Sequence, residues 1–451
     1  MRPKPSWTPR LSDVAGRPYE RLVGALADDI LAGDLAPDDR LPAHRDVAER
    51  LGLSLGTVTR AYDVLQRRGL ARSEKGRGMF VNAARPARPR SVDLSVNLPP
   101  AVIQSSTLSA LITEVGREIV PETFTRYAPP AGLPEHRLMM ARKLAEDRGI
   151  RVEPAQLMLT NGAQHAIAIA MGALPPGPVA VEELTYPGVL RAAQALGRAL
   201  VPLALDRDGV RPEALEAALD GATPPVAAYL TPSSQNPTGA LLSRDRRARL
   251  AALARERGVH LIEDDADAVF APADLPSLAE LAPDRVLHIG SASKSLAPGL
   301  RLGYLVTAPE MIEPCTGWLK ATASMGNPLS AMLMSQAIGA RLTTSIAASI
   351  RTEAARRCAM AREVLGPWLV EGARDALHVW LPMPTARARE IVLAAARLNI
   401  TLAPPEAFMP DPGVADAGLR LCLGNAPLAD LRGALEVIAT LLRGGQDSAL
   451  V

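Results

Sequence analysis

Several residue types that would define a class of protein are scarce in this sequence. The three cysteines, Cys315, Cys358 and Cys422, are far apart and odd in number, so they predict neither a disulfide framework nor a metal site and fit a cytoplasmic location. The six histidines are scattered, and we expect no metal. No run of about 18 uncharged apolar residues occurs, and the N-terminus lacks an apolar leader, so we expect neither a membrane span nor a signal peptide.

Lysine is scarce too, and the net charge is small. The 451-residue chain has a formal charge of +2, so contact with nucleic acid must come from a local basic patch. Apolar residues make up 48% and charged residues 22%, the balance of an ordinary globular protein, and the length suggests about three folding units. Of the five lysines, Lys75 and Lys294 stand in unusual surroundings.

Residues 12–82 have the pattern of a small DNA-binding domain. Apolar spacing and turn residues predict three helices and two short strands, over 19–31, 43–51, 55–68, 70–73 and 79–81. Gly52 makes a tight turn before the third helix, and Ser54 is its expected N-cap. This order is typical of a winged helix-turn-helix. The alternative is a small helical domain that binds no nucleic acid.

Basic and hydroxyl side chains fall where such a domain would meet double-stranded DNA. They lie on the second helix, on the third helix, which would enter the major groove, and on the hairpin. The candidate DNA-binding residues are Arg45, Thr57, Thr59, Arg60, Lys75 and Arg77.

Residues 16–82 resemble the DNA-binding domain of the GntR family of bacterial repressors. The resemblance rests on LAPDDRLP at 35–42, RDVA at 45–48 and TVTRAY at 57–62. It departs at the start of the third helix, where many members carry Ser-Arg-Asn and this chain has Ser54-Leu55-Gly56. Leucine cannot contact a phosphate or a guanine as arginine does, so the operator sequence of the family does not carry over.

The pattern changes after the hairpin. Residues 83–92 are rich in proline and arginine without periodicity, which predicts a semi-rigid linker. From residue 93 to about 306, strands alternate with helices, which predicts an α/β domain with a mostly parallel sheet. The stretch from about 310 to 451 is helix-rich with short strands near 376–381 and 419–423, and predicts a smaller α/β subdomain within a domain over 93–451.

Four predicted strands in this region end in polar residues, and each of these ends alone is weak evidence for a binding site. Gly162-Ala163-Gln164 opens a helix and is suited to a phosphate. A rigid loop at 231–239 follows a second strand, although asparagine is also common in simple turns. Glu263-Asp264-Asp265 ends a third strand, as a functional acid or as an N-cap of the next segment. Lys294 lies among serine hydroxyls after a fourth strand.

Taken in order, these segments describe a site for pyridoxal 5'-phosphate (PLP). Lys294 is the candidate for the Schiff base with the aldehyde, because burial beside positive charge keeps an amine partly neutral. Asp264 would keep the pyridine nitrogen protonated, Asn236 would donate to the ring oxygen, and Tyr186 would stack on the ring. The phosphate would bind to Gly162, Ala163, Gln164, Ser291, Ser293 and Arg301.

Residues 93–451 resemble the fold-type-I PLP-dependent aminotransferases, most specifically in NPTG at 236–239 and in SASK at 291–294 followed by Arg301. The resemblance implies that Arg420 binds a substrate or effector carboxylate, for which the alternative is a surface arginine on a strand. It also implies that Tyr127 reaches the phosphate of a neighbouring subunit, and hence a homodimer.

The chain departs from the aminotransferase pattern at Ala266 and Asp267, where the family usually has a tyrosine that bonds the ring oxygen. The ring oxygen therefore loses one donor, and the sequence leaves open whether Asp267 adds an acid to the site. We expect weakened or absent transamination.

A GntR-type domain followed by an aminotransferase-like domain resembles the MocR group of regulators. The resemblance implies a DNA-binding transcriptional regulator, cytoplasmic and nucleoid-associated when bound to its operator. Its aminotransferase-like domain would sense an amino acid or amine through formation of an external aldimine in place of Lys294. One alternative is a catalytically active PLP-dependent aminotransferase with an appended DNA-binding domain, and another is a degenerate protein with an empty cofactor pocket. A half-reaction alone would favour the regulator, and sustained transamination would favour the enzyme.

Overall fold

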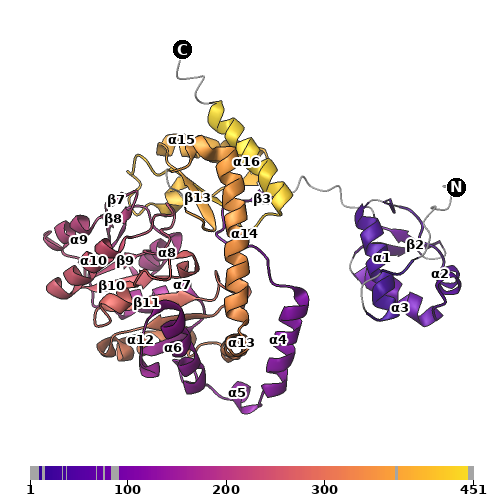
Figure 1. Cartoon of the computed structure of the whole chain (residues 1–451), viewed down its shortest axis with the longest axis horizontal. Coiled ribbons are helices and arrows are strands. Elements are labelled where there is room, and N and C mark those ends of the chain that lie inside the picture. Colours follow the sequence, from indigo (N-terminus) through magenta and orange to yellow (C-terminus); the bar gives the residue numbers. More distant parts are fainter. Residues whose placement is uncertain are drawn as a thin grey trace. The chain divides into compact units, whose positions relative to one another are not determined.

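The computed structural model describes residues 10–12, 16–32, 34–36, 38–67, 69–74, 77–82, 91–370 and 374–444. The chain divides into two compact units, residues 1–90 and 91–451 (Figure 1). Lys75 and residues 83–90 of the predicted linker lie outside the described residues. Within the described ranges, no helix combines the length and the apolar character needed to cross a bilayer.

The N-terminal unit is a winged helix-turn-helix, as predicted. Its elements are α1 (Pro18–Ala32), α2 (His44–Leu51), α3 (Leu55–Arg67), β1 (Ala71–Glu74) and β2 (Gly78–Val81). The core packs Leu26 and Val47 of the first two helices against Tyr62 of the third. Gly52, at φ +64°, turns the chain after α2, and the Ser54 hydroxyl accepts the backbone N–H of Thr57 at 3.1 Å. This N-cap fixes the start of α3.

The second unit is built on a seven-stranded sheet of order β4-β12-β11-β10-β9-β5-β6. The strands are β4 (Leu157–Thr160), β5 (Val179–Glu182), β6 (Leu200–Leu203), β9 (Ala227–Leu230), β10 (His260–Asp264), β11 (Val286–Ser291) and β12 (Gly303–Val306). Neighbouring strands run parallel, except that β12 is antiparallel to β4 and β11. The mostly parallel sheet expected from the sequence is therefore confirmed.

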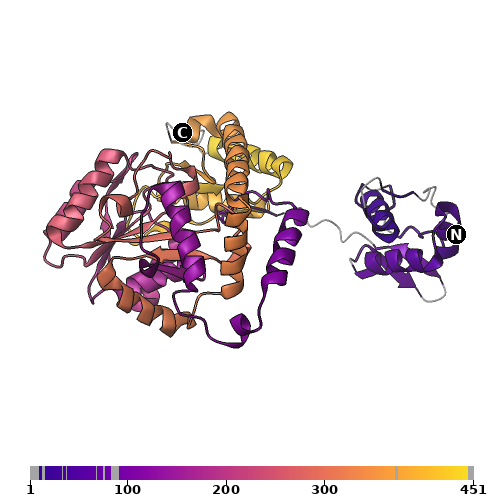
Figure 2. The same cartoon turned by 60° about the horizontal axis from the view of Figure 1, so that its bottom comes forward.

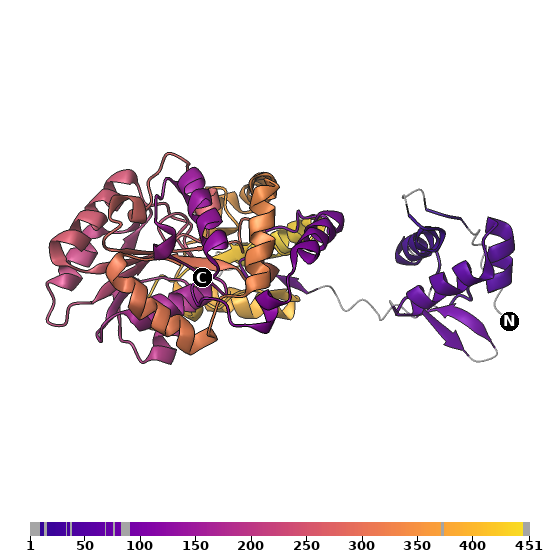
Figure 3. The same ribbon diagram turned by 90° about the horizontal axis from the view of Figure 1, so that it is seen from below.

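Helices cover both faces of this sheet (Figures 1 and 3). Side chains alternate along each strand, so Val181 and Ile262 pack in the core with α7, α8 and α12, whereas Ala180 and Leu261 pack with helices of the other face. The helices are α6 (Pro134–Arg148), α7 (Ala163–Ala173), α8 (Pro187–Leu196), α9 (Pro212–Leu219), α10 (Arg244–Arg257), α11 (Leu278–Leu281), α12 (Ile312–Ala323) and α13 (Pro328–Gly339).

The C-terminal part has its own core, to which the start of the unit contributes Leu94. Its elements are β3 (Val92–Asp93), α14 (Leu342–Leu365), β13 (His378–Leu381), α15 (Thr385–Arg397), β14 (Ile400–Thr401), β15 (Leu419–Cys422) and α16 (Leu428–Arg443). Strand β3 pairs in parallel with β14, β13 pairs with β15, and α14 packs beside α16 (Figure 2). The chain after β3 is thereby anchored to the C-terminal part.

The α-helices and strands not yet named are α4 (Ser105–Glu118), α5 (Glu122–Thr125), β7 (Leu205–Asp206) and β8 (Gly209–Val210). Helix α4 packs against α13.

Candidate functional site

The carboxyl ends of the parallel strands face a cavity of 670 Å³, within the range of about 300–1,000 Å³ that small-molecule sites occupy. The cavity contains most of the residues that the sequence predicts for the cofactor and the carboxylate. These are Ala163, Gln164, Tyr186, Asn236, Asp264, Ser291, Ser293, Lys294, Arg301 and Arg420. Segments far apart in the sequence therefore meet in one place.

Two of the predicted residues do not line the cavity. Gly162 is the N-cap of α7, with φ +90°, and directly precedes Ala163, which does line the cavity. A Cβ at this position would lie 2.6 Å from Nη2 of Arg301, so glycine allows the guanidinium to lie against the start of the helix. Tyr127 lies between α5 and α6 and is 84% exposed. Its contact with a neighbouring subunit stays a prediction.

One end of the cavity is suited to a dianion. The first N–H groups of α7, in Ala163 and Gln164, have no acceptor within the helix, and the helix dipole is positive there. The Ser291 and Ser293 hydroxyls lie 2.9 Å apart at the same end. Arg301 adds an exposed guanidinium on a left-handed backbone, with φ +49°. Backbone donors, hydroxyls and a guanidinium together can bind a phosphate.

Asp264 carries a buried carboxylate at the end of β10. Its Oδ2 accepts a hydrogen bond of 2.6 Å from the Tyr229 hydroxyl, and its Oδ1 accepts the N–H of Ala266 at 3.2 Å. Burial raises the pKa of Asp264 to about 6, and these hydrogen bonds oppose that rise. A carboxylate held in this way can pair with a protonated ring nitrogen.

Asn236 and Arg420 are bonded to each other across the cavity. Nη1 of Arg420 donates to Oδ1 of Asn236 at 2.7 Å, and Nη2 donates to the carbonyl of Ser95 at 2.6 Å. Because Oδ1 of Asn236 is an acceptor here, its amide N–H groups are left to donate to a ligand. Arg420 is only 5% exposed, so the alternative of a surface arginine is wrong.

The loop that carries Asn236 is hydrogen-bonded to a buried acid. Oε2 of Glu182, at the end of β5, accepts from the Thr231 hydroxyl at 2.7 Å and from Nε2 of Gln235 at 3.0 Å. Burial raises the pKa of Glu182 to about 7. The Asn236–Pro237 peptide bond is cis. The loop is thus more than a simple turn, because a buried hydrogen-bond network sets its position.

Lys294 lines the cavity, and its Nζ donates to the backbone carbonyl of Asn97. The Asn97 side chain is buried, and neither polar atom of its amide has a partner among the described residues. Asp267 lines the cavity as well, with the charged groups of Lys294 and Arg420 in its surroundings. Burial raises the pKa of the Asp267 carboxyl, and the charges of Lys294 and Arg420 lower it.

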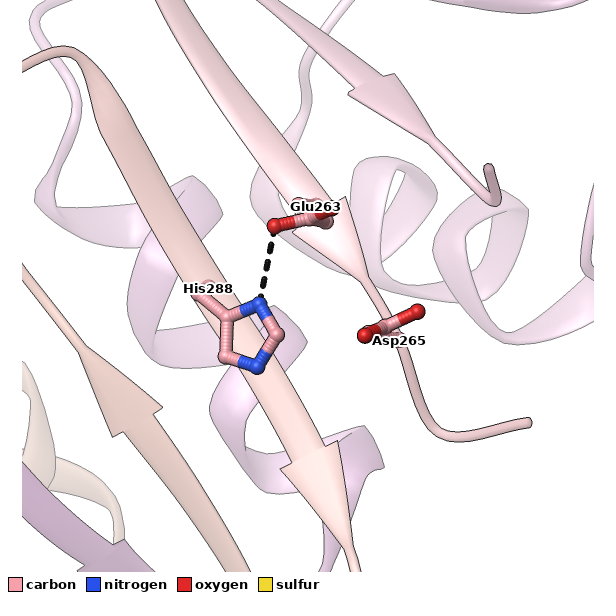
Figure 4. Close-up of side chains that lie close together, drawn as sticks. All are labelled: Glu263, Asp265 and His288. Carbon is pink, nitrogen blue, oxygen red and sulfur yellow. Dashed lines mark hydrogen bonds and ion pairs between the residues drawn. The ribbon is translucent and has the colours of Figure 1, made fainter. Parts of the chain in front are cut away.

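The other two acids at the end of β10 belong to a separate buried cluster (Figure 4). Glu263 bonds Nδ1 of His288 at 2.9 Å and accepts two backbone N–H groups at the start of α11, at 2.7 and 3.0 Å. Asp265 pairs with Arg148 at 3.0 Å. The sequence predicts either a functional acid or an N-cap of the next segment. Glu263 bonds the start of α11, whose N-cap is Ser277, and Asp264 lines the cavity.

The candidate DNA-binding residues differ in how free their side chains are. Arg45 is exposed on α2, and Arg77 is exposed on the hairpin, where it pairs with Glu74 at 2.7 Å. The Arg60 guanidinium lies 4.3 Å from the centre of the Tyr19 ring. The two threonines of α3 bond close to their own helix. The Thr57 hydroxyl lies 2.8 Å from that of Ser54, and the Thr59 hydroxyl donates to the carbonyl of Leu55 at 3.0 Å.

Comparison with known proteins agrees with this two-part organisation. Residues 89–404 match the family model of aminotransferase class I and II, and residues 18–81 match that of bacterial regulatory proteins, gntR family. The uncharacterised HTH-type transcriptional regulator YdeF of Bacillus subtilis is 29% identical over 97% of both chains. The probable rhizopine catabolism regulatory protein MocR of Rhizobium meliloti is 29% identical over 70% of both chains.

A solved aminotransferase structure also resembles this chain. LysN, the α-aminoadipate aminotransferase of Thermus thermophilus, complexed with N-(5'-phosphopyridoxyl)-L-leucine, is 25% identical to this chain. The likeness has a TM-score of 0.72 and covers 80% of this chain and 93% of LysN.

The aminotransferase class I and II fold implies PLP as the cofactor, and the cavity residues fit it. Glycine at 162 leaves room for Arg301 beside the helix N-terminus, a buried carboxylate is available at Asp264, and Asn236 keeps a free amide donor. When bound, PLP supplies an aldehyde that condenses with amines and a ring that acts as an electron sink.

Proposed function

Because the chain belongs to the class I and II aminotransferase family and carries a gntR-family DNA-binding domain, we propose that it is a MocR-type transcriptional regulator whose PLP-dependent domain senses an amino acid or amine. One observation carries this proposal. A single chain contains a winged helix-turn-helix and a cavity in which Lys294, Asp264 and Arg420 lie together.

The site residues predicted from the sequence have separate roles in the proposal. Lys294 would hold the cofactor through its aldehyde, which is also the group that condenses with the amine of a ligand. Asp264 would pair with the ring nitrogen, and Tyr186 would stack on the ring. The phosphate would be bound by Gly162, Ala163, Gln164, Ser291, Ser293 and Arg301, together with Tyr127 of a second copy. The ligand carboxylate binds to Arg420.

Arg420 offers a route from the ligand to a change of conformation. It lies on β15 and bonds Asn236, which follows a strand of the large sheet, and Ser95, which follows β3. A ligand carboxylate that pairs with Arg420 competes with these two bonds. Such competition can shift the C-terminal part against the large sheet if the ligand binds one arrangement better than the other.

The protein is a homodimer in this proposal. Several exposed apolar side chains lie on α4, α5 and the segments next to them. They are Leu108, Ile112, Ile119, Val120 and Phe124. Apolar side chains gathered in this way favour association with a second copy. Light scattering on a size-exclusion column should give twice the chain mass, and a monomer would contradict the dimer.

Operator binding tests the sensing function. DNA sequences bound by the PLP-loaded full chain are first selected from random duplexes. Their affinity is then measured with and without a panel of amino acids and amines. We expect at least one compound to change the affinity, and Lys294→Ala to keep DNA binding but lose that response. A mutant that responds like the wild type would show that sensing does not pass through Lys294.

An active aminotransferase is the second candidate, and the presence of Asp264, Asn236, Lys294 and Arg420 in one cavity favours it. Sustained conversion of an amino donor and a keto acid would support the enzyme. Asp267 favours the regulator, because it stands where the aminotransferase pattern has a tyrosine donor.

A further inference from the structure

Two polar side chains in the cavity have no part in holding the cofactor. The first is Asn97, which is 8% exposed and whose amide nitrogen and oxygen both lack a partner within the described part of the chain. A buried polar group that has no hydrogen-bond partner is destabilising. The short segment that carries Asn97 bonds Arg420 through the Ser95 carbonyl and Lys294 through the Asn97 carbonyl. The segment from Ser95 to Asn97 therefore runs between the proposed positions of the ligand carboxylate and the ligand amine, with Asn97 at the amine end.

The second is Asp267, whose Oδ1 is buried and has no hydrogen-bond partner among the residues that the structure describes. Its surroundings contain the cations Lys294 and Arg420 and the acid Asp265. In the proposed function Arg420 pairs with the ligand carboxylate, so its charge is shared with the ligand. A positive charge on the ligand side chain would then give the Asp267 carboxylate a further partner.

We propose that the cavity selects an amino acid with a second protonated amine, and that Asp267 and Asn97 bind this second amine. This inference rests on the proposed sensing function and names its class of ligand. An ammonium has three donors, so it can bond Oδ1 of Asn97 and the Asp267 carboxylate together. A hydroxyl has one donor and no charge, and cannot do both.

The test compares diamino acids with monoamino acids of the same length on the PLP-loaded full chain. The pairs are 2,3-diaminopropanoate with alanine, 2,4-diaminobutanoate with 2-aminobutanoate, and ornithine with norvaline. Equilibrium binding is measured by calorimetry. We expect at least one diamino acid to bind about tenfold more tightly than its partner, the ratio that 1.4 kcal/mol produces.

Variants of the chain test which side chains cause the preference for diamino acids. Asp267→Asn should bring each pair to within about twofold, because it removes the charge that strengthens the hydrogen bond. Asn97→Ala should weaken binding of the preferred diamino acid more than that of its monoamino partner. Asp416→Asn, which changes an exposed carboxylate, should keep the full preference. Melting curves show whether each variant is folded.

The outcomes separate this inference from the proposed function. Equal binding within every pair, tighter binding of homoserine than of 2,4-diaminobutanoate, or a preference that survives Asp267→Asn would overturn the inference. The sensing function would still stand if operator affinity responded to any amino compound. Diamino selectivity with no response of operator affinity would instead overturn the sensing function alone.

Discussion

The Tyr229 hydroxyl donates a hydrogen bond of 2.6 Å to Oδ2 of Asp264, and both side chains are buried. The phenol stabilises the ionised carboxylate, and burial opposes ionisation. Asp264 can pair with a protonated ring nitrogen only while it is ionised. Tyr229 therefore stabilises the ionised form of Asp264, which is the form that would pair with a bound cofactor.

Tyr229→Phe tests this relationship. The substitution removes one hydrogen bond to a charged group, which contributes about 1.5–3 kcal/mol, so we expect PLP to bind about tenfold more weakly. The pKa of Asp264 should rise, and the loss of affinity should therefore grow as the pH falls towards 6. Absorbance titration with PLP measures both effects. Tyr304→Phe is the matched control, because Tyr304 is also a tyrosine of the sheet and stacks on His288 instead.

Local pattern was sufficient to predict much of the fold and the site. A serine before an apolar periodicity predicts the N-cap at Ser54, and a position after a buried strand indicates Lys294. Such features depend on residues close in the sequence. The helix-turn-helix and the mostly parallel sheet were predictable for the same reason.

Tyr229 and Asn97 could not be identified in this way. A tyrosine in a buried strand looks like any core residue until the pairing of β9 with β10 places it beside Asp264. Asn97 is 197 positions from Lys294, and only the anchoring of β3 to β14 brings the two together. The roles of the site residues and the domain boundaries proposed from the sequence stay predictions.

Glu182 predicts a pH dependence of stability. Burial raises its pKa from 4.5 to about 7, so between these values the folded state holds more protons than the unfolded state. The contribution of Glu182 to the free energy of unfolding therefore falls as the pH rises through this window. A one-unit change in pKa corresponds to about 1.4 kcal/mol.

Glu182→Gln removes this titration. Thermal unfolding of the wild type and the variant at about pH 4.5, 6, 7 and 8 gives the difference between them. We expect the wild type to lose stability relative to the variant as the pH rises to about 7, and the difference to level off above it. A difference that does not change with pH would mean that Glu182 does not titrate in this range.

Leu55 predicts a preference for thymine in the operator. It is the first residue of α3 and is 47% exposed, and the first residues of a recognition helix contact base edges in the major groove. The thymine methyl is the apolar group in that groove. Leu55→Ala should therefore reduce discrimination at one base pair of each half-site.

Replacing thymines one at a time by deoxyuridine removes the methyl and locates this contact. Wild-type affinity should fall at one position per half-site, and the Leu55→Ala protein should be insensitive to the same replacement. If the wild type tolerates deoxyuridine at every position, Leu55 does not bind a thymine methyl.

Arg420 predicts a difference between amino acids and simple amines. A guanidinium can bind a carboxylate through two parallel hydrogen bonds, which an ammonium cannot reproduce. Arg420→Lys should therefore weaken binding of amino acids by about 100-fold, because a hydrogen bond to a charged group contributes about 1.5–3 kcal/mol. Amines without a carboxylate should bind as they do to the wild type. Calorimetric titration of the PLP-loaded variant measures both. Arg432→Lys is the control, since Arg432 forms an exposed ion pair with Glu363 at 2.8 Å, and such pairs contribute about 0–1 kcal/mol. Equal losses for amino acids and amines would mean that Arg420 holds Asn236 and Ser95 in place and does not bind the ligand carboxylate.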